Sequence, residues 1–88
     1  MPDAIFEKGA MRRFGEKLRM LRTKKGMTLK ELASALGLTA HGYISELETG
    51  KKKPTAEFVL NVARFFEVSI DELLKDELEV NGKWPPPL

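Results

Sequence analysis

Residues 27–54, MTLKELASALGLTAHGYISELETGKKKP, decide the fold of this chain. Thr28 and Glu31 have the spacing of a capping box, in which a hydroxyl and a carboxylate satisfy the free amides at the start of a helix. Apolar residues at helical spacing follow as far as Leu36, and Gly37 then supplies a residue type that ends helices. A short helix is therefore predicted after Thr28.

A second short helix is predicted to begin near Thr39 and to run to about Glu48. Ile44 and Leu47 lie three residues apart, so they share one face of that helix. Thr39 is a residue type favoured at the N-cap, and Gly50 follows the last turn. Two short helices joined by a glycine-containing turn form a candidate helix-turn-helix.

Three further helices are expected around this unit. Apolar spacing of three and four residues predicts one helix over about 11–25. The most hydrophobic helix is expected after Pro54 and Thr55. A second capping box at Ser69 and Glu72 predicts a short last helix that directs its apolar residues inward, namely Ile70, Leu73 and Leu74.

The predicted fold class is all-α, a compact five-helix domain with a short extended C-terminal tail. Residues 1–10 are expected to be a flexible arm, residues 11–75 the domain, and residues 76–88 a tail that forms dimer contacts. Asn81-Gly82 is a hairpin turn signal, but the prolines at 85–87 would limit a second strand to about two residues. An extended tail that packs through Trp84 on a partner subunit is expected instead.

Charge is distributed unevenly along the chain. Residues 1–53 carry 12 Lys/Arg and 6 Asp/Glu, whereas residues 54–88 carry 3 and 7. The basic part favours a polyanionic partner, although two ordinary solvated surfaces explain the charge alone equally well. No apolar run approaches a membrane span of about 20 residues. Asp3 and Glu7 differ from an apolar signal peptide, so no membrane partner and a cytoplasmic location are expected.

Catalysis finds little support in the composition. Eighty-eight residues suffice for one domain, with one histidine and no cysteine. The sequence has no phosphate-cradling glycine loop and no carboxylate cluster of metal-binding geometry. It therefore predicts neither an enzyme, nor a cofactor, nor a metal site.

Several short sequence motifs occur in order between residues 18 and 74: LRMLR, MT, ELA, LGLT, YISELETG and VSIDELL. Because of these motifs, the stretch from Phe14 to Leu74 resembles the phage-repressor-like helix-turn-helix family, also called the xenobiotic-response-element type. The resemblance implies a compact five-helix, repressor-like DNA-binding domain whose second short helix enters the major groove of double-stranded DNA.

The resemblance places the base-reading side chains on that second short helix, because a helix fits the major groove. The candidates are Thr39, Ala40, His41, Tyr43 and Ser45. His41 has a donor for guanine or phosphate, and Ala40 has a methyl group for thymine. Alternatives stay open: Thr39 as an N-cap only, Tyr43 as a residue at the core edge, and His41 as merely exposed.

Phosphate contacts are expected on both sides of that helix. The lysines of the following loop are candidates, as is the start of the first short helix, which gives Lys51, Lys52, Lys53, Thr28 and Lys30. Taken alone, a run of lysines is more often a solvated loop. Gly42 weakens a helix by roughly 1 kcal/mol relative to alanine, so it indicates either a close backbone approach or a bent entry.

Arg22 and Glu48 are expected to be structural. The resemblance implies that they form a largely buried pair, which ties the first helix to the end of the recognition helix. Two departures from the family pattern matter. Leu29 stands where the family usually has a phosphate-gripping glutamine, and one extra residue before Glu48 shifts or bulges the helix start near Thr39.

The function expected from the sequence is a sequence-specific transcriptional regulator that binds a palindromic operator as a homodimer. One recognition helix reads only about four or five base pairs, and a second copy doubles the site. The alternative is an antitoxin-like or adaptor module that acts mainly through an unidentified protein partner. Trp84 and the acidic C-terminal part are the surface for that partner.

Overall fold

The computed structural model describes residues 12–80 of the chain. Five helices lie within this part: α2 (Phe14–Lys24), α3 (Leu29–Ala35), α4 (Gly42–Glu48), α5 (Ala56–Phe66) and α6 (Ile70–Leu74). The all-α, five-helix prediction is thus confirmed. Four expectations concern residues that the structure does not describe. They are the N-terminal arm, the start of the first helix at Met11, the Asn81-Gly82 turn and the packing of Trp84.

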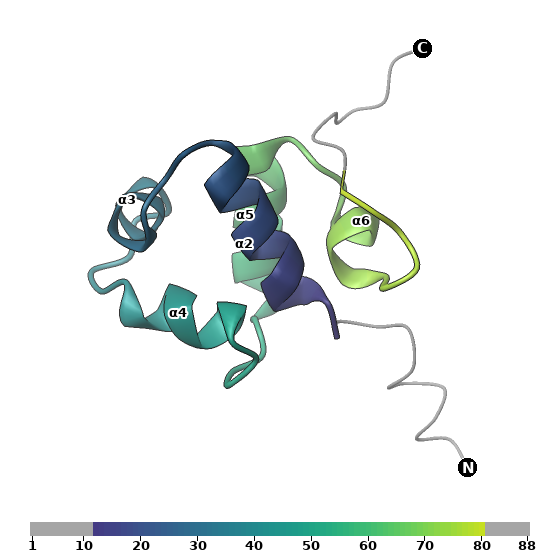
Figure 1. Ribbon diagram of the computed structural model, residues 1–88, viewed down its shortest axis with the longest axis horizontal. Helices are drawn as coiled ribbons and strands as arrows, with labels where there is room; N and C mark the ends of the chain where they lie inside the picture. The colour runs from purple at the N-terminus through teal and green to yellow at the C-terminus, as the bar shows by residue number, and fades with distance from the viewer. Residues whose placement is uncertain (1–11, 81–88) are drawn as a thin grey trace.

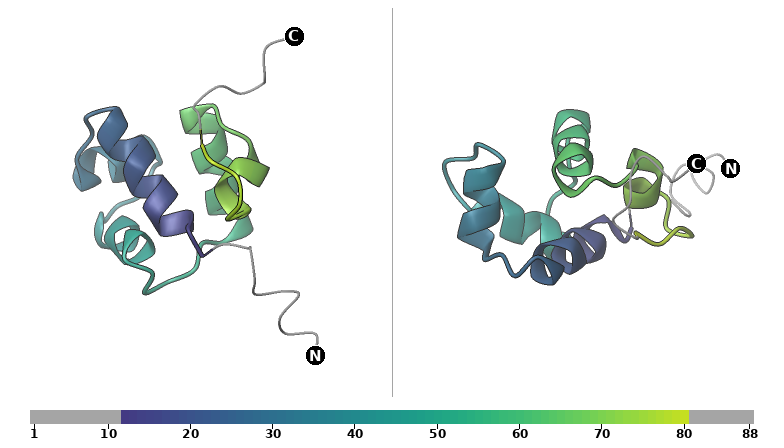
Figure 2. Two further views of the ribbon diagram at one scale, coloured as in Figure 1. Left: turned by 45° about the vertical axis from the view of Figure 1, so that its right-hand side comes forward. Right: turned by 90° about the horizontal axis from the view of Figure 1, so that it is seen from above.

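Helix α2 lies at the centre of the molecule (Figure 1). It packs against α4 on one side and against α6 on the other, while α3 packs on α4 and α5 packs on α6. Seen from above, α3 and α4 stand at one end of the molecule, α6 stands at the other, and α5 lies behind α2 (Figure 2). The helix-turn-helix unit and the acidic last helix are therefore at opposite ends.

One apolar core joins all five helices. Phe58 of α5 lies in this core and makes edge-to-face contacts with Phe14 of α2 and Tyr43 of α4, at centroid distances of 6.3 and 5.3 Å. Such aromatic pairs add stability beyond the area that they bury. The fully buried side chains around them include Leu18, Leu32, Ile44, Leu47, Val62, Val68 and Leu73.

Both capping boxes predicted from the sequence are present. Thr28 Oγ1 accepts from the Glu31 amide at 3.0 Å, and Glu31 Oε1 accepts from the Thr28 amide at 2.8 Å. Ser69 and Glu72 form the same reciprocal pair, at 2.9 Å in each direction. These caps satisfy amides that have no partner within the helix, so they fix where α3 and α6 begin.

The start of α4 is a correction to the prediction. The helix begins at Gly42, with His41 as its N-cap residue, and no side chain caps it. Thr39 therefore does not cap the helix. Leu38 packs partly buried against the core, and its amide bonds the Ala33 carbonyl at 2.8 Å. This closure of α3 is followed by three more residues before α4 begins at Gly42.

Ile70 is a second correction, since it is 41% exposed rather than directed inward. Helix α6 has only five residues, and only Leu73 is fully buried. Leu74 is partly buried against the core, as expected. Ile70 occupies the first helical position, on the side of α6 that the rest of the described chain leaves uncovered.

Residues 76–80 fold back onto α2 rather than leaving the domain as an extended tail. The Arg13 amide donates to Asp76 Oδ1 at 2.9 Å, and Arg13 Nη1 donates to the Asp76 carbonyl at 2.9 Å. Val80 packs against the core. Arg13 also holds Glu79 through both terminal nitrogens, at 2.9 and 3.0 Å. The folded unit therefore extends at least to Val80.

Lys17 is the buried polar residue of the described core. Its ammonium group donates to the carbonyl oxygens of Glu72 and Lys75, both at 2.6 Å. Burial lowers the pKa of Lys17, because desolvation disfavours the charged form. The side chain thus reaches from α2 to cap the end of α6, where carbonyls have no helical partner.

Candidate nucleic-acid interface

An ion pair fixes the helix-turn-helix unit to α2. Arg22 Nε lies 2.7 Å from Glu48 Oε2, and Arg22 Nη2 lies 3.0 Å from Glu48 Oε1. The two side chains are only 13% and 7% exposed. Arg22 Nη1 also donates to the Met27 carbonyl at 2.8 Å. The sequence-predicted partners are therefore brought together, and Arg22 additionally holds the segment that leads into α3.

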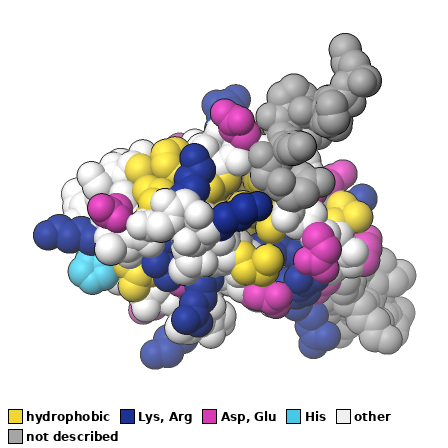
Figure 3. All heavy atoms as spheres, turned by 45° about the horizontal axis from the view of Figure 1, so that its top comes forward, with side chains coloured by type: hydrophobic (Ala, Val, Ile, Leu, Met, Phe, Trp, Pro, Cys, Tyr) yellow, Lys and Arg dark blue, Asp and Glu magenta, His cyan; other side chains and the backbone are white. Residues whose placement is uncertain are grey.

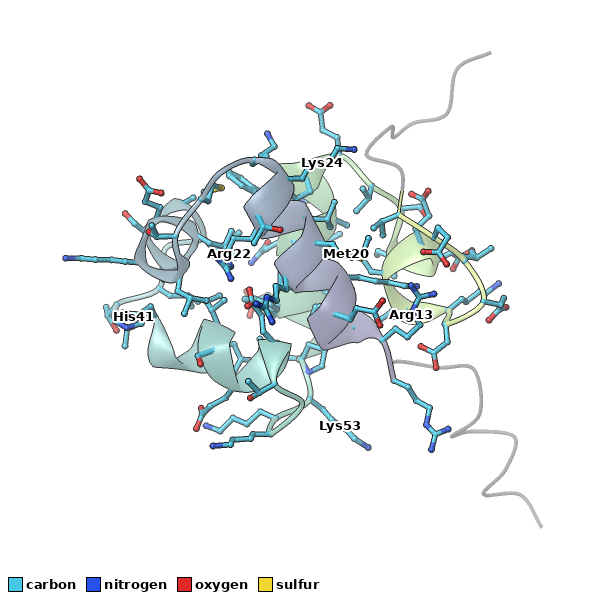
Figure 4. The ribbon with its side chains drawn as sticks, viewed as in Figure 1. Arg13, Met20, Arg22, Lys24, His41 and Lys53 are labelled. Atoms are coloured by element: carbon cyan, nitrogen blue, oxygen red, sulfur yellow. The ribbon has the colours of Figure 1, made fainter. Side chains whose placement is uncertain are left out.

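This fork has an electrostatic consequence for Arg22. The hydrogen bonds to Glu48 raise the pKa of the guanidinium above its ordinary value. A forked pair of this kind has strict geometry, because two parallel N–H groups must meet two carboxylate oxygens. The C-terminal end of α4 is therefore held in a fixed orientation relative to α2. Arg22 lies on the side of α2 that faces α3 and α4 (Figure 4).

A close approach between α2 and α4 supports the same orientation. A β-carbon on Gly15 would clash with the Leu47 carbonyl oxygen and would lie 2.8 Å from the Glu48 carbonyl oxygen. Glycine is therefore required where α2 crosses the end of α4. The sequence reasoning missed this residue, although an isolated glycine within an amphipathic helix is a recognised signal of close packing.

The base-reading candidates fall into two groups. Thr39, Ala40 and His41 are exposed in the turn before α4, and Tyr43 and Ser45 are half-buried on the helix itself. His41 lies at the outer end of α4, away from α2 (Figure 4). Three of the five candidates are thus presented by the turn rather than by the helix.

Tyr43 packs at the core edge. Its ring contacts Phe58 from one side, and Lys52 Nζ lies 5.9 Å from its centroid. This is one of the two roles that the sequence left open for Tyr43. This packing fixes the ring of Tyr43, which is half-buried. The side chain of His41, in contrast, is exposed.

The lysines expected to bind phosphate lie in the loop between α4 and α5, and all three are exposed. Lys53 projects from the lower edge of the molecule in Figure 4. Lys52 Nζ forms an ion pair with Glu46 Oε1 at 3.2 Å. Lys52 is thus tied to α4, whereas Lys51 and Lys53 form no ion pair within residues 12–80.

Glu46 was missed by the sequence reasoning. It lies on α4 with its side chain 42% exposed, so a carboxylate stands on the helix expected to approach DNA. Its partner, Lys52, is six residues away and beyond the helix end. This spacing is not one of the helical spacings at which pairs are read from sequence.

The start of α3 also carries exposed candidates. Thr28 Oγ1 uses a lone pair to cap the helix, which leaves its hydroxyl hydrogen available as a donor. Lys30 is exposed beside it. Leu29, which replaces the glutamine typical of the family pattern, packs partly buried against the core. The residue that departs from the pattern therefore contributes to folding.

Gly42 differs from Gly15 in its surroundings. A β-carbon on Gly42 would meet nothing within 4 Å, and its backbone is not in the left-handed region. Space within the domain therefore does not demand glycine there.

Acidic side chains gather at the end of the molecule that carries α6, and the histidine lies at the other end (Figure 3). Within residues 12–80 there is no group of three or more His, Asp or Glu side chains placed to hold a metal ion. None of the helices in that range has the length and apolar character needed to cross a membrane.

Comparison with known proteins agrees with this geometry. Residues 18–73 match a family model described as "Helix-turn-helix". The chain belongs to this helix-turn-helix family, of the phage-repressor type. It is 44% identical over 64 residues to the HTH-type transcriptional activator BcrR of Enterococcus faecalis, an alignment that covers 73% of this chain and 31% of that protein.

Solved structures share the fold. The N-terminal DNA-binding domain of SinR from Bacillus subtilis is 31% identical, with a TM-score of 0.63 over 69% of this chain and 88% of that one. The structure of SinR, a master regulator for biofilm formation, in complex with DNA is 31% identical and gives 0.62, over 68% of this chain and 95% of that one. The chain spans only about a third to two thirds of the length of its first curated relatives.

Proposed function

We propose that this protein is a transcriptional regulator that binds double-stranded DNA in a sequence-specific manner, as a homodimer on a palindromic operator. Helix α4 and the turn before it enter the major groove, and the lysines of the α4–α5 loop contact phosphates. The observation that carries the proposal is the Arg22–Glu48 fork, which sets α4 in one orientation with its N-terminal end exposed.

Two other findings support the same function. His41, Ala40 and Thr39 present donors, a methyl group and a hydroxyl at the exposed end of α4. The relatives include named transcriptional regulators, and one structurally similar protein was solved in complex with DNA. The cytoplasm is the location that belongs to this proposal, because a regulator must share a compartment with its DNA.

Two copies on one operator give a geometric requirement. Recognition helices of a symmetric dimer read half-sites about one helical turn, or roughly 34 Å, apart. The alternative function as a module for a protein partner depended on Trp84, which lies outside the described residues, and on the acidic C-terminal part, of which α6 is described. No contact among residues 12–80 favours that alternative.

Selection of bound duplexes from a random DNA pool tests the proposal. The expected result is an enriched palindrome whose half-sites are spaced by one helical turn, with affinity that falls by about 0.9 log units per log unit of salt for each neutralised phosphate. A pool that remains random after selection at low salt would overturn the proposal. Enrichment of a single half-site without symmetry would retain DNA reading and overturn the homodimer.

A further inference from the structure

Helix α4 has one face that the rest of the domain leaves uncovered. Ile44 and Leu47 are buried, whereas Gly42 and Thr49 are exposed. Glu46 lies four residues after Gly42, so these two residues share the uncovered face. A β-carbon on Gly42 would meet nothing within 4 Å, and the residue has no side chain of its own. Another molecule can therefore approach this face closely, and Glu46 is the residue that reaches furthest from it.

The Glu46 carboxylate is held by one cation of the following loop. Lys52 Nζ lies 3.2 Å from Glu46 Oε1, and the two side chains remain 55% and 42% exposed. The same ammonium group lies 5.9 Å from the ring centroid of Tyr43, which packs in turn against Phe58. A carboxylate can accept about four hydrogen bonds, so a single ammonium group leaves acceptor capacity free.

A carboxylate on a DNA-reading helix repels the phosphates on either side of the groove. It weakens binding to every duplex whose base edges do not compensate it, and it thereby adds specificity. The donors that the base edges offer to a carboxylate in the major groove are N4 of cytosine and N6 of adenine. Adenine N6 stands beside N7, whose lone pair repels a second carboxylate oxygen, whereas cytosine N4 stands beside a C–H group. Cytosine is therefore the base that Glu46 fits best.

We propose that Glu46 is a specificity-determining residue, and that its carboxylate accepts a hydrogen bond from N4 of one cytosine in each half-site of the operator. Lys52 is a positioning residue, because it orients the carboxylate and offsets its charge near the phosphates. The inference rests on the proposed function and adds a base contact from the middle of α4 to those expected from the turn before it.

Selection of duplexes by Glu46→Gln tests this assignment, with Asp71→Asn as the matched control. Each substitution removes one negative charge, but Asp71 is an exposed residue of α6, at the opposite end of the molecule from α3 and α4 (Figures 1 and 2). Glutamine pairs with adenine through two hydrogen bonds. Glu46→Gln should therefore change the preferred base at one position of each half-site from cytosine to adenine, whereas Asp71→Asn should select the wild-type site.

Removal of the cytosine amino group tests the hydrogen bond itself. In the selected duplex, 2-pyrimidinone replaces the cytosine, which exchanges the amino group for a hydrogen atom. Wild-type affinity, measured by fluorescence anisotropy, should fall about tenfold more than the affinity of Glu46→Ala does. The replacement weakens base pairing equally in both measurements, so the difference between the two proteins reports the contact. Thermal melting of each variant checks that it is folded.

Three outcomes would overturn the proposal. The first is a wild-type site that Glu46→Ala and Glu46→Gln both select unchanged. The second is loss of the cytosine preference in Lys52→Met but not in Glu46→Ala, which would assign the base contact to Lys52. The third is a selected site without cytosine in its half-sites. All three leave DNA reading by the domain standing, whereas failure of the wild-type protein to enrich any duplex would overturn the proposed function as well.

Discussion

Gly15 of α2 lies directly against the carbonyl oxygen of Leu47, at the point where α2 crosses the end of α4. The contact involves backbone on the α4 side, which has no flexible side chain to move aside. This crossing and the Arg22–Glu48 fork hold the same end of α4 from two directions. The orientation of α4 is therefore determined by α2.

Gly15→Ala should destabilise the domain, because its methyl group would clash with that backbone. We expect a loss of about 1–3 kcal/mol, as for other overpacked sites. The midpoint of thermal unfolding should fall by about 4–8 °C per kcal/mol for a domain of this size. Gly42→Ala is the matched control, since open space surrounds Gly42. An equal loss of stability in both variants would contradict the close crossing.

Arg22→Ala should abolish cooperative unfolding or come close to it. The substitution leaves the Glu48 carboxylate, with its side chain only 7% exposed, without its partner. Breaking a buried pair costs roughly 3–5 kcal/mol, out of a typical stability of about 5–15 kcal/mol. Calorimetry of Arg22→Ala measures the loss in the free energy of unfolding. The double variant Arg22→Met/Glu48→Met should recover part of that loss. Unchanged melting of Arg22→Ala would show that the fork is not needed for folding.

Acid should release residues 76–80 from α2. Hydrogen bonds from Arg13 lower the pKa of Glu79 below its ordinary value in the folded protein. A carboxyl group with a depressed folded-state pKa stabilises the fold at pH values above its unfolded pKa, and this contribution is lost as pH falls through the folded-state pKa. NMR signals of Val80 should therefore change as the pH falls through the lowered pKa of Glu79. The same transition in Glu79→Gln would contradict the assignment, because that variant cannot titrate at position 79.

Alanine substitution of the loop lysines should weaken binding to all duplexes to a similar degree. Removal of one lysine–phosphate interaction should reduce the log–log salt slope by about 0.9. Lys53→Ala is the cleanest single variant, since Lys52 also pairs with Glu46. Lys24→Ala is the control, because Lys24 lies at the opposite edge of the molecule from Lys53 (Figure 4). If the two variants have the same salt slope, the loop does not contact phosphate.

Local signals made much of this fold predictable. The capping boxes at Thr28 and Ser69 involve residues three apart, and their chemistry is the same in any context. The five helices followed from apolar spacing, which reflects which face is buried. Ile70 was the exception, because spacing does not reveal that a helix of five residues buries little of its surface.

Contacts between residues far apart in the sequence were harder to predict. Arg13 and Glu79 are 66 residues apart, and Lys17 caps α6 from 55 and 58 residues away. No periodicity relates such positions, so the return of residues 76–80 to α2 was not predicted. The start of α4 was misplaced for a related reason, because the closure of α3 by Leu38 determines where helical bonding resumes.

Chemical-shift mapping of backbone amides on addition of the selected duplex tests the central claim most directly. The account predicts that the largest changes occur at residues 28–30 and 39–53, which include the turn before α4 and the lysine loop. Amides of α5 and α6 should change little at constant dimer concentration. Large changes confined to α5 and α6, with residues 39–53 unmoved, would contradict DNA reading by α4.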